Sequence, residues 1–114
     1  MVTIKGTTII MTKGDSAYIT VSILNADGTE YVPQAGDTVR FAMKRDYTDQ
    51  EPLLVINIPT ETMELVIRPD DTKDLEAGQI HGRYKYDLEL SRENGEVIDT
   101  FIPRADFIVL EEVL

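Results

Sequence analysis

The segment that most constrains the fold of this chain runs from residue 82 to residue 91, where apolar and charged residues alternate without a break. The apolar positions are Tyr84, Tyr86, Leu88 and Leu90, and the charged positions are Arg83, Lys85, Asp87 and Glu89. A period of two residues is that of a strand with one buried face, because successive side chains of a strand point to opposite sides. This segment therefore predicts a half-buried β-strand whose tyrosines and leucines enter the core.

Shorter apolar runs with the same period occupy most of the remaining chain. The further expected strands cover residues 7–11, 17–24, 37–44, 53–58, 63–67, 97–102 and 105–110. In the run 37–44, one face holds Val39, Phe41 and Met43, and the other holds Arg40, Ala42 and Lys44. The run 53–58 is almost continuously apolar between Pro52 and Pro59, which predicts a strand covered on both faces. Pro103 and Arg104 interrupt the last two runs and predict two separate strands there.

Turn signals separate these runs. Asp27-Gly28 and Asn94-Gly95 are pairs typical of tight turns between antiparallel strands. Pro69, followed by Asp70 and Asp71, predicts a helical stretch of at most one or two turns near residues 70–75. The first few residues and the stretches 28–36 and 47–51 are expected to be flexible.

This spacing predicts one all-β domain spanning residues 1–114. The expected architecture is an antiparallel, immunoglobulin-like β-sandwich of about seven or eight strands, with a small barrel as the alternative. In such sandwiches a tyrosine near a strand start hydrogen-bonds back across the corner, and Tyr84 is the candidate for that role.

Composition narrows the classes of function. The chain has no cysteine, which removes disulfides and thiolate chemistry, and its net charge of −10 disfavours a nucleic acid partner. The N-terminal sequence does not resemble a secretory signal, and no apolar stretch is long enough for a spanning helix. We therefore expect neither a signal peptide nor a membrane partner.

Residues able to carry catalysis are few and scattered. The single histidine, His81, would need a nearby serine and acid to act in a triad, and none of Ser16, Ser22 and Ser91 lies in a nucleophile-elbow motif. No glycine-rich phosphate loop is present, since Gly78 and Gly82 are not followed by a helical pattern. The sequence predicts that the protein is not an enzyme and has no catalytic, cofactor-binding or metal-binding residues.

Two residue groups could bind a ligand, although each has a simpler interpretation. The acidic residues Asp70, Asp71, Asp74 and Glu76 could attract calcium, but they lack the spacing of a calcium loop and more simply serve the helix start and solvation. The five tyrosines, Tyr18, Tyr31, Tyr47, Tyr84 and Tyr86, could form a stacking platform for sugars. Tyr84 and Tyr86 are predicted core residues by alternation, whereas Tyr18, Leu24 and Tyr31 are expected to point outward or lie in loops.

An ordered set of segments between Lys13 and Val109 resembles small domains of tailed bacteriophages and prophages. The segments are Lys13-Gly14-Asp15-Ser16, Asn25-Ala26-Asp27-Gly28-Thr29, residues 36–45, residues 67–72 with 75–78, residues 84–90, Asn94-Gly95-Glu96-Val97 and Asp106-Phe107-Ile108-Val109. Together they are similar to the N-terminal domain of baseplate upper proteins and to related short virion proteins of immunoglobulin-like fold. The resemblance implies a non-enzymatic β-sandwich building block of the virion and supplies no catalytic residues.

Two functions remain open at this stage. The first is a phage or prophage structural subunit of baseplate, tail or head, assembled in the bacterial host cytoplasm. Its partners would be other virion proteins or a second copy of the chain, met through a sheet edge or face. Because the sequence stops soon after the last expected strand, a host-receptor role is not expected. The alternative is a carbohydrate- or ligand-binding β-sandwich module of a bacterial surface protein, since one fold serves many functions.

Overall fold

A computed structural model describes residues 2–5, 7–46, 48–78, 80–92 and 96–111 of the chain. Its strands are β1 (Val2–Lys5), β2 (Thr8–Thr12), β3 (Ala17–Thr20), β4 (Thr38–Lys44), β5 (Leu54–Ile58), β6 (Glu64–Ile67), β7 (Arg83–Ser91) and β8 (Val97–Leu110). The helix α1 (Pro69–Thr72) has proline at its start, as its sequence predicts. The expected all-β fold with one short helical turn is confirmed.

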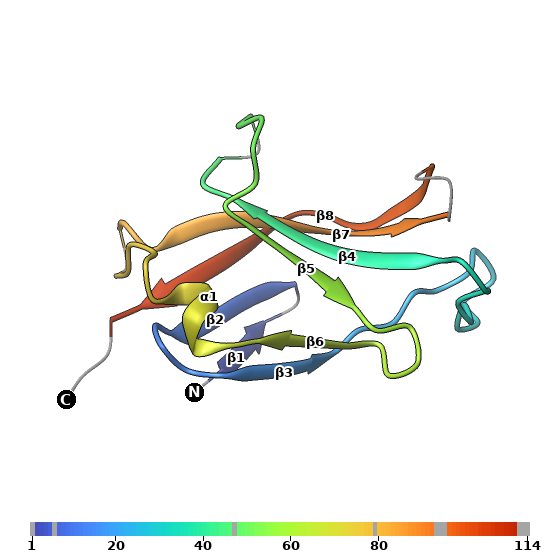
Figure 1. The fold of residues 1–114 in the computed structure, drawn as a ribbon, viewed down its shortest axis with the longest axis horizontal. Helices are drawn as coiled ribbons and strands as arrows, with labels where there is room; N and C mark the ends of the chain where they lie inside the picture. Colours follow the sequence, from blue (N-terminus) through green and yellow to red (C-terminus); the bar gives the residue numbers. More distant parts are fainter. Residues whose placement is uncertain (1, 6, 47, 79, 93–95, 112–114) are drawn as a thin grey trace.

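The strands form two sheets that pack face to face. The larger sheet has the order β1-β2-β8-β7-β4-β5, and the smaller one pairs β3 with β6. In Figure 1 the small sheet lies against one face of the large sheet, with α1 at one end of the molecule. The order β8-β7-β4-β5 opposite β3-β6 matches the G-F-C-C′ and B-E strands of an immunoglobulin sandwich. One pair, β2 with β8, is parallel, and the other paired strands are antiparallel as expected.

The alternating residues of β4 and β7 build the centre of the core. Tyr84, Tyr86, Leu88 and Leu90 of β7 and Val39, Phe41 and Met43 of β4 are all buried. The Phe41 ring stacks on Tyr86 with centroids 5.3 Å apart and meets Phe107 of β8 edge-on at 6.0 Å. The sequence therefore predicted this central part of the core correctly.

Tyr84 anchors the corner between α1 and β7. Its hydroxyl donates a hydrogen bond of 3.0 Å to the carbonyl oxygen of Glu76, which lies upstream of the strand. The guanidinium of Arg45 covers the same ring at 4.7 Å from its centroid. The predicted tyrosine corner is confirmed.

At Gly82 the neighbouring backbone leaves no room for a side chain. A Cβ atom at this position would lie 2.1 Å from the carbonyl oxygen of Val109 and 2.6 Å from that of Gly78. The backbone here is bound to β8, because Val109 N–H donates to the Gly82 carbonyl oxygen at 2.8 Å. Gly82 thus serves close backbone packing.

Several strand predictions are wrong in their extent. The run 17–24 is a strand only to Thr20, although Val21 and Ile23 are still buried. The strand ends there because the backbone groups of Val21 and Ile23 form hydrogen bonds with Met63 and Tyr31, which lie in loops, and not with a neighbouring strand. The start of the chain, expected to be flexible, contains β1, which extends the sheet beyond β2.

The run 53–58 is not covered on both faces. It forms β5 at the edge of the large sheet, and Val55 is 45% exposed. Its apolar composition could not reveal that position, since an edge strand and a central strand differ in their neighbours and not in their own sequence.

The two strands expected around Pro103 and Arg104 are one continuous strand, β8. Its pairing with β7 shifts register between Tyr86 and Leu88, which marks a β-bulge opposite Asp87. The bulge accommodates the proline, so the strand is bent there rather than ended. The predicted turn at Asn94-Gly95 lies outside the described residues, but β7 and β8, on either side of it in the sequence, pair antiparallel as expected.

Candidate functional site

The histidine and the serines lie on separate parts of the fold. His81 is 73% exposed in its side chain, and its Nδ1 is 3.9 Å from Glu76 Oε2. Ser91 ends β7, whereas His81 lies just before that strand begins. Ser16 lies before β3 and Ser22 after it. The structure therefore does not bring a hydroxyl and an imidazole together in the arrangement that a triad needs.

Three of the four acidic residues considered for calcium, namely Asp70, Asp71 and Glu76, contact local partners. Asp71 Oδ2 accepts a 2.7 Å hydrogen bond from the backbone N–H of Arg68, and Asp70 lies 3.5 Å from Lys73 Nζ. Glu76 lies 3.3 Å from Arg45 Nη2. Within the described ranges, no group of three or more metal-ligating side chains is found.

The tyrosines do not form a platform among the described residues. Tyr84 and Tyr86 are in the core, and Tyr18 is 64% exposed on β3. Leu24 is exposed as expected, but Tyr31 is half-buried and its hydroxyl donates to Asp37 Oδ2 at 2.6 Å. This hydrogen bond holds the pKa of Asp37 below and that of Tyr31 above their usual values. Tyr47 lies outside the described residues.

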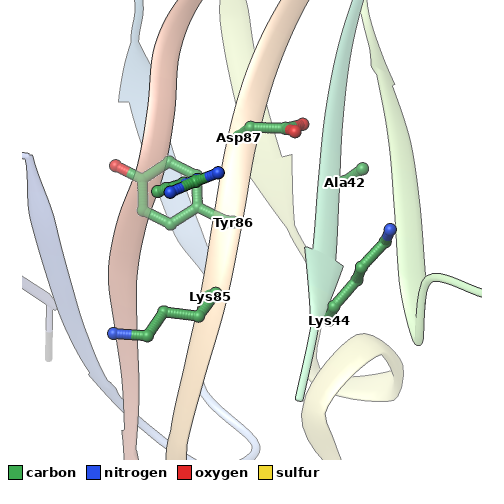
Figure 2. A pocket seen from close by; sticks show the side chains of 6 residues that line it. Ala42, Lys44, Lys85, Tyr86 and Asp87 are labelled. Carbon is green, nitrogen blue, oxygen red and sulfur yellow. The ribbon is translucent and has the colours of Figure 1, made fainter. Parts of the chain in front are cut away.

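A better candidate site lies on the outer face of the large sheet, the face turned away from β3 and β6. A hollow of about 60 Å³ opens there, which we call the outer-face hollow. It is lined by Ala42, Lys44, Lys85, Tyr86, Asp87 and Arg104 (Figure 2). These residues come from the three neighbouring strands β4, β7 and β8.

The hollow exists because the small side chain of Ala42 lies opposite the short side chain of Asp87, while Lys44 and Lys85 point away from each other. Ala42 pairs with Asp87 across β4 and β7, and Lys44 pairs with Lys85 in the same register. Like charges directly opposite repel each other. Lys85 accordingly ion-pairs with Asp106 of β8, while Lys44 Nζ donates to the carbonyl oxygen of Asp49 at 2.6 Å. In Figure 2 Lys85 extends towards β8, whereas Asp87 extends towards β4.

Asp87 is the least satisfied polar residue of the hollow. Its Oδ1 atom is buried and has no hydrogen-bond partner. Burial raises the pKa of the Asp87 carboxyl, and the charge of nearby Glu89 raises it further, while Lys44 and Arg40 act in the opposite direction. A carboxylate held in this way lowers stability, because its desolvation is not offset by a hydrogen bond.

Arg104 reaches the hollow from the bulge of β8. Its φ of 50° is in the left-handed region, which a residue with a side chain adopts at a cost of about 1–2 kcal/mol. Bulges of this kind redirect a side chain relative to the regular pleat. The fold therefore maintains a strained backbone at the residue that supplies a cation to the hollow, and such strain is characteristic of functional sites.

Chemically, the outer-face hollow can bind charged or hydrogen-bonding groups of another molecule. Sequence alternation had placed Lys44, Lys85 and Asp87 on outward faces, but it did not bring them together. The sequence predicts Arg104 in a break between two strands, and not at a binding site. The sequence signal for the position of Arg104 was the proline inside an otherwise continuous β pattern. Such a proline can mark a bulge within one strand as well as a break between two strands.

A second, apolar cavity opens between the two sheets beside β2 and β3. Its volume is about 180 Å³. It is lined by Thr7, Ile9, Ile19, Thr20, Val21, Ser22, Leu65, Tyr86, Leu88 and Ile102. A dry apolar cavity of this size can admit a small apolar group.

The comparisons with family models, curated proteins and solved structures gave no match. In the described part of the chain, no helix is both long and apolar enough to cross a lipid bilayer.

Proposed function

We propose that this chain is a non-catalytic structural subunit of a tailed phage or prophage that assembles with other virion proteins through the outer face of its large sheet. The order of the segments between Lys13 and Val109, which resembles that of baseplate upper proteins, supports the virion setting. The assembly role rests on the outer-face hollow.

The observation that carries the assembly role is the coincidence of two unfavourable features in one hollow. Asp87 has a buried oxygen without a partner, and Arg104 has a strained backbone. Neither feature stabilises the isolated domain. The unpartnered oxygen of Asp87 lies where a docking molecule would supply a hydrogen bond, which supports a binding role for this face.

The direct test is co-expression of the chain with the proteins encoded beside it, followed by size-exclusion chromatography with multi-angle light scattering. We expect a stable complex that contains a virion protein. A chain that stays monomeric and binds none of these proteins would overturn the proposal.

A variant that fills the hollow tests whether the complex forms through the outer face. Ala42→Tyr fills the hollow with a side chain that points away from the core, and we expect it to abolish the complex while leaving the melting temperature nearly unchanged. The matched control is Ala26→Tyr, because Ala26 is exposed in the turn between Asn25 and Gly28, away from the sheet. Loss of the complex in the control alone would contradict the assignment of this face.

The apolar cavity beside β3 supports a second candidate function, the binding of a small apolar ligand. Its lining includes the apolar residues Ile9, Ile19 and Leu65. Indole and toluene are suitable probes, and binding predicts a rise in the melting temperature at millimolar concentration. An unchanged melting temperature with both probes would remove this candidate.

A further inference from the structure

We propose that the outer face docks an acidic segment of a partner protein, one carboxylate of which enters the outer-face hollow above Ala42. This inference rests on the proposed assembly function and assigns the chemistry of the partner.

The first support is the sign of the charge on this face. Among the described side chains, the outward positions of β4, β7 and β8 near the hollow hold five bases, namely Arg40, Lys44, Arg83, Lys85 and Arg104. They hold three acids, namely Asp87, Glu89 and Asp106. The whole chain has a net charge of −10, so this face has the opposite sign to the rest of the molecule. An acidic partner is therefore electrostatically complementary to this face and not to the remainder.

The second support is that two arginines of this face project further into solvent than Glu89 and Asp87, although Asp106 is slightly more exposed than its partner Lys85. In the 2.7 Å ion pair between Arg40 and Glu89, the arginine side chain is 47% exposed and the glutamate 18%. Arg104 is exposed, whereas Asp87 is half-buried with one oxygen fully covered. An approaching molecule therefore meets the guanidinium groups of Arg40 and Arg104 before it meets the carboxylates of Glu89 and Asp87.

The third support is the spread of the two paired lysines. Lys44 and Lys85 turn away from each other, and the hollow lies between them. A carboxylate placed between them would remove the repulsion that keeps them apart. Lys44 would also exchange its bond to the Asp49 carbonyl oxygen for a stronger charge-assisted one.

Removing the charge of Asp87 should have opposite effects on the binding of a carboxylate and on the binding of a cationic or amide group. A bound carboxylate would lie near the Asp87 carboxylate and be repelled by it, so removing that charge should strengthen binding. If the hollow instead received a cationic or amide group, Asp87 would be its acceptor, and the same change would weaken binding.

The test measures binding of a fluorescein-labelled hexaglutamate peptide to the full chain by fluorescence anisotropy. We expect the Kd to rise with salt concentration, because exposed charges are screened. We expect Lys44→Ala, Lys85→Ala and Arg104→Gly each to raise the Kd roughly fivefold, and Asp87→Asn to lower it by a similar factor. The control is Lys73→Ala, which removes one positive charge beside Asp70 at the end of α1, outside the strands that form this face, and should leave the Kd nearly unchanged.

Several results would overturn the inference. They are the absence of saturable peptide binding at low salt, an equal effect of Lys73→Ala, or weaker binding by Asp87→Asn. Tighter binding of a single-stranded oligonucleotide than of the peptide would assign the face to nucleic acid instead. A dimer of the chain alone that Arg104→Gly dissociates would assign it to a second copy.

The proposed function and this inference can fail separately. A virion complex that the three basic-residue variants leave intact would keep the assembly role and remove the acidic partner. Hexaglutamate binding with the expected variant effects, but with no complex with any neighbouring gene product, would keep the basic face and remove the assembly role.

Discussion

Phe41 and Ala42 are neighbours on β4, yet they lie on two faces of the large sheet with different construction. Phe41 is fully buried on the inner face, in contact with the rings of Tyr86 and Phe107. Ala42 lies on the outer face at a hollow bordered by lysines, a strained arginine and a partly desolvated aspartate. Aromatic and aliphatic side chains pack around Phe41 on the inner face, whereas on the outer face one carboxylate oxygen of Asp87 is buried without a hydrogen-bond partner.

The difference supports the proposal that the outer face binds a partner, while the inner face packs the core. Apolar packing on the inner face stabilises the domain in proportion to the area it buries. On the outer face, the positive φ of Arg104 costs about 1–2 kcal/mol, within a bulge that accommodates Pro103 in β8. Backbone strain is not confined to this face, because Met63, which packs against the core, also has a positive φ of 52°.

The largest effect is expected from the inner face. Phe41→Ala should lower the free energy of unfolding by about 3–5 kcal/mol, because it leaves a cavity between Tyr86 and Phe107. Urea denaturation measures this, with Phe41→Leu as a milder variant if the alanine variant does not fold. Arg40→Ala on the outer face of the same strand should cost less than about 1 kcal/mol. Equal losses would contradict the contrast between the faces.

A smaller loss is expected at the polar tip of an inner-face residue. Tyr84→Phe removes the hydrogen bond to the Glu76 carbonyl oxygen and should cost about 1 kcal/mol. The change is measurable by chemical denaturation at constant pH. Tyr18→Phe is the matched control, since Tyr18 is largely exposed, and its effect should lie within about 0.5 kcal/mol of zero. A larger effect for Tyr18 than for Tyr84 would refute the corner assignment.

On the outer face, one substitution should increase stability. Arg104→Gly relieves the positive φ and should raise the free energy of unfolding by about 0.5–1 kcal/mol, seen as a higher melting temperature. Arg92→Gly, at an exposed arginine without a positive φ, should lower it instead. A loss of stability in Arg104→Gly would mean that the bulge contributes to the fold itself.

The smallest effect is expected at Asp87 and depends on pH. Because its folded-state pKa is raised, the folded state binds the proton more tightly than the unfolded state. Its ionisation therefore destabilises the fold as pH rises through the folded-state pKa. Asp87→Asn should stabilise the protein at pH 7 by less than about 1 kcal/mol, given its partial exposure, and the gain should vanish below about pH 3.8. Melting curves of the unsubstituted protein and of Asp87→Asn from pH 3 to pH 8 measure this stabilisation. A stabilisation that grows as the pH falls would contradict the raised pKa of Asp87.

Much of the inner face could be predicted from the sequence. The alternation in β7 and β4 identified seven buried residues, and the corner tyrosine was identified from its position at the strand start. The outer-face site could be predicted only in part. Lys44, Lys85 and Asp87 were correctly placed on outward faces, but their proximity depends on the pairing of β4 with β7, and Arg104 depends on the bulge.

By itself, the sequence determined the period of the strands and the side of each strand that enters the core, because alternation is a local property of the backbone. The tertiary structure decided which strands are neighbours, that β5 lies at an edge and that β8 continues through Pro103 and Arg104. Those outcomes depend on contacts between residues far apart in the chain. A hollow formed by three paired strands therefore has no counterpart in any one of their sequences.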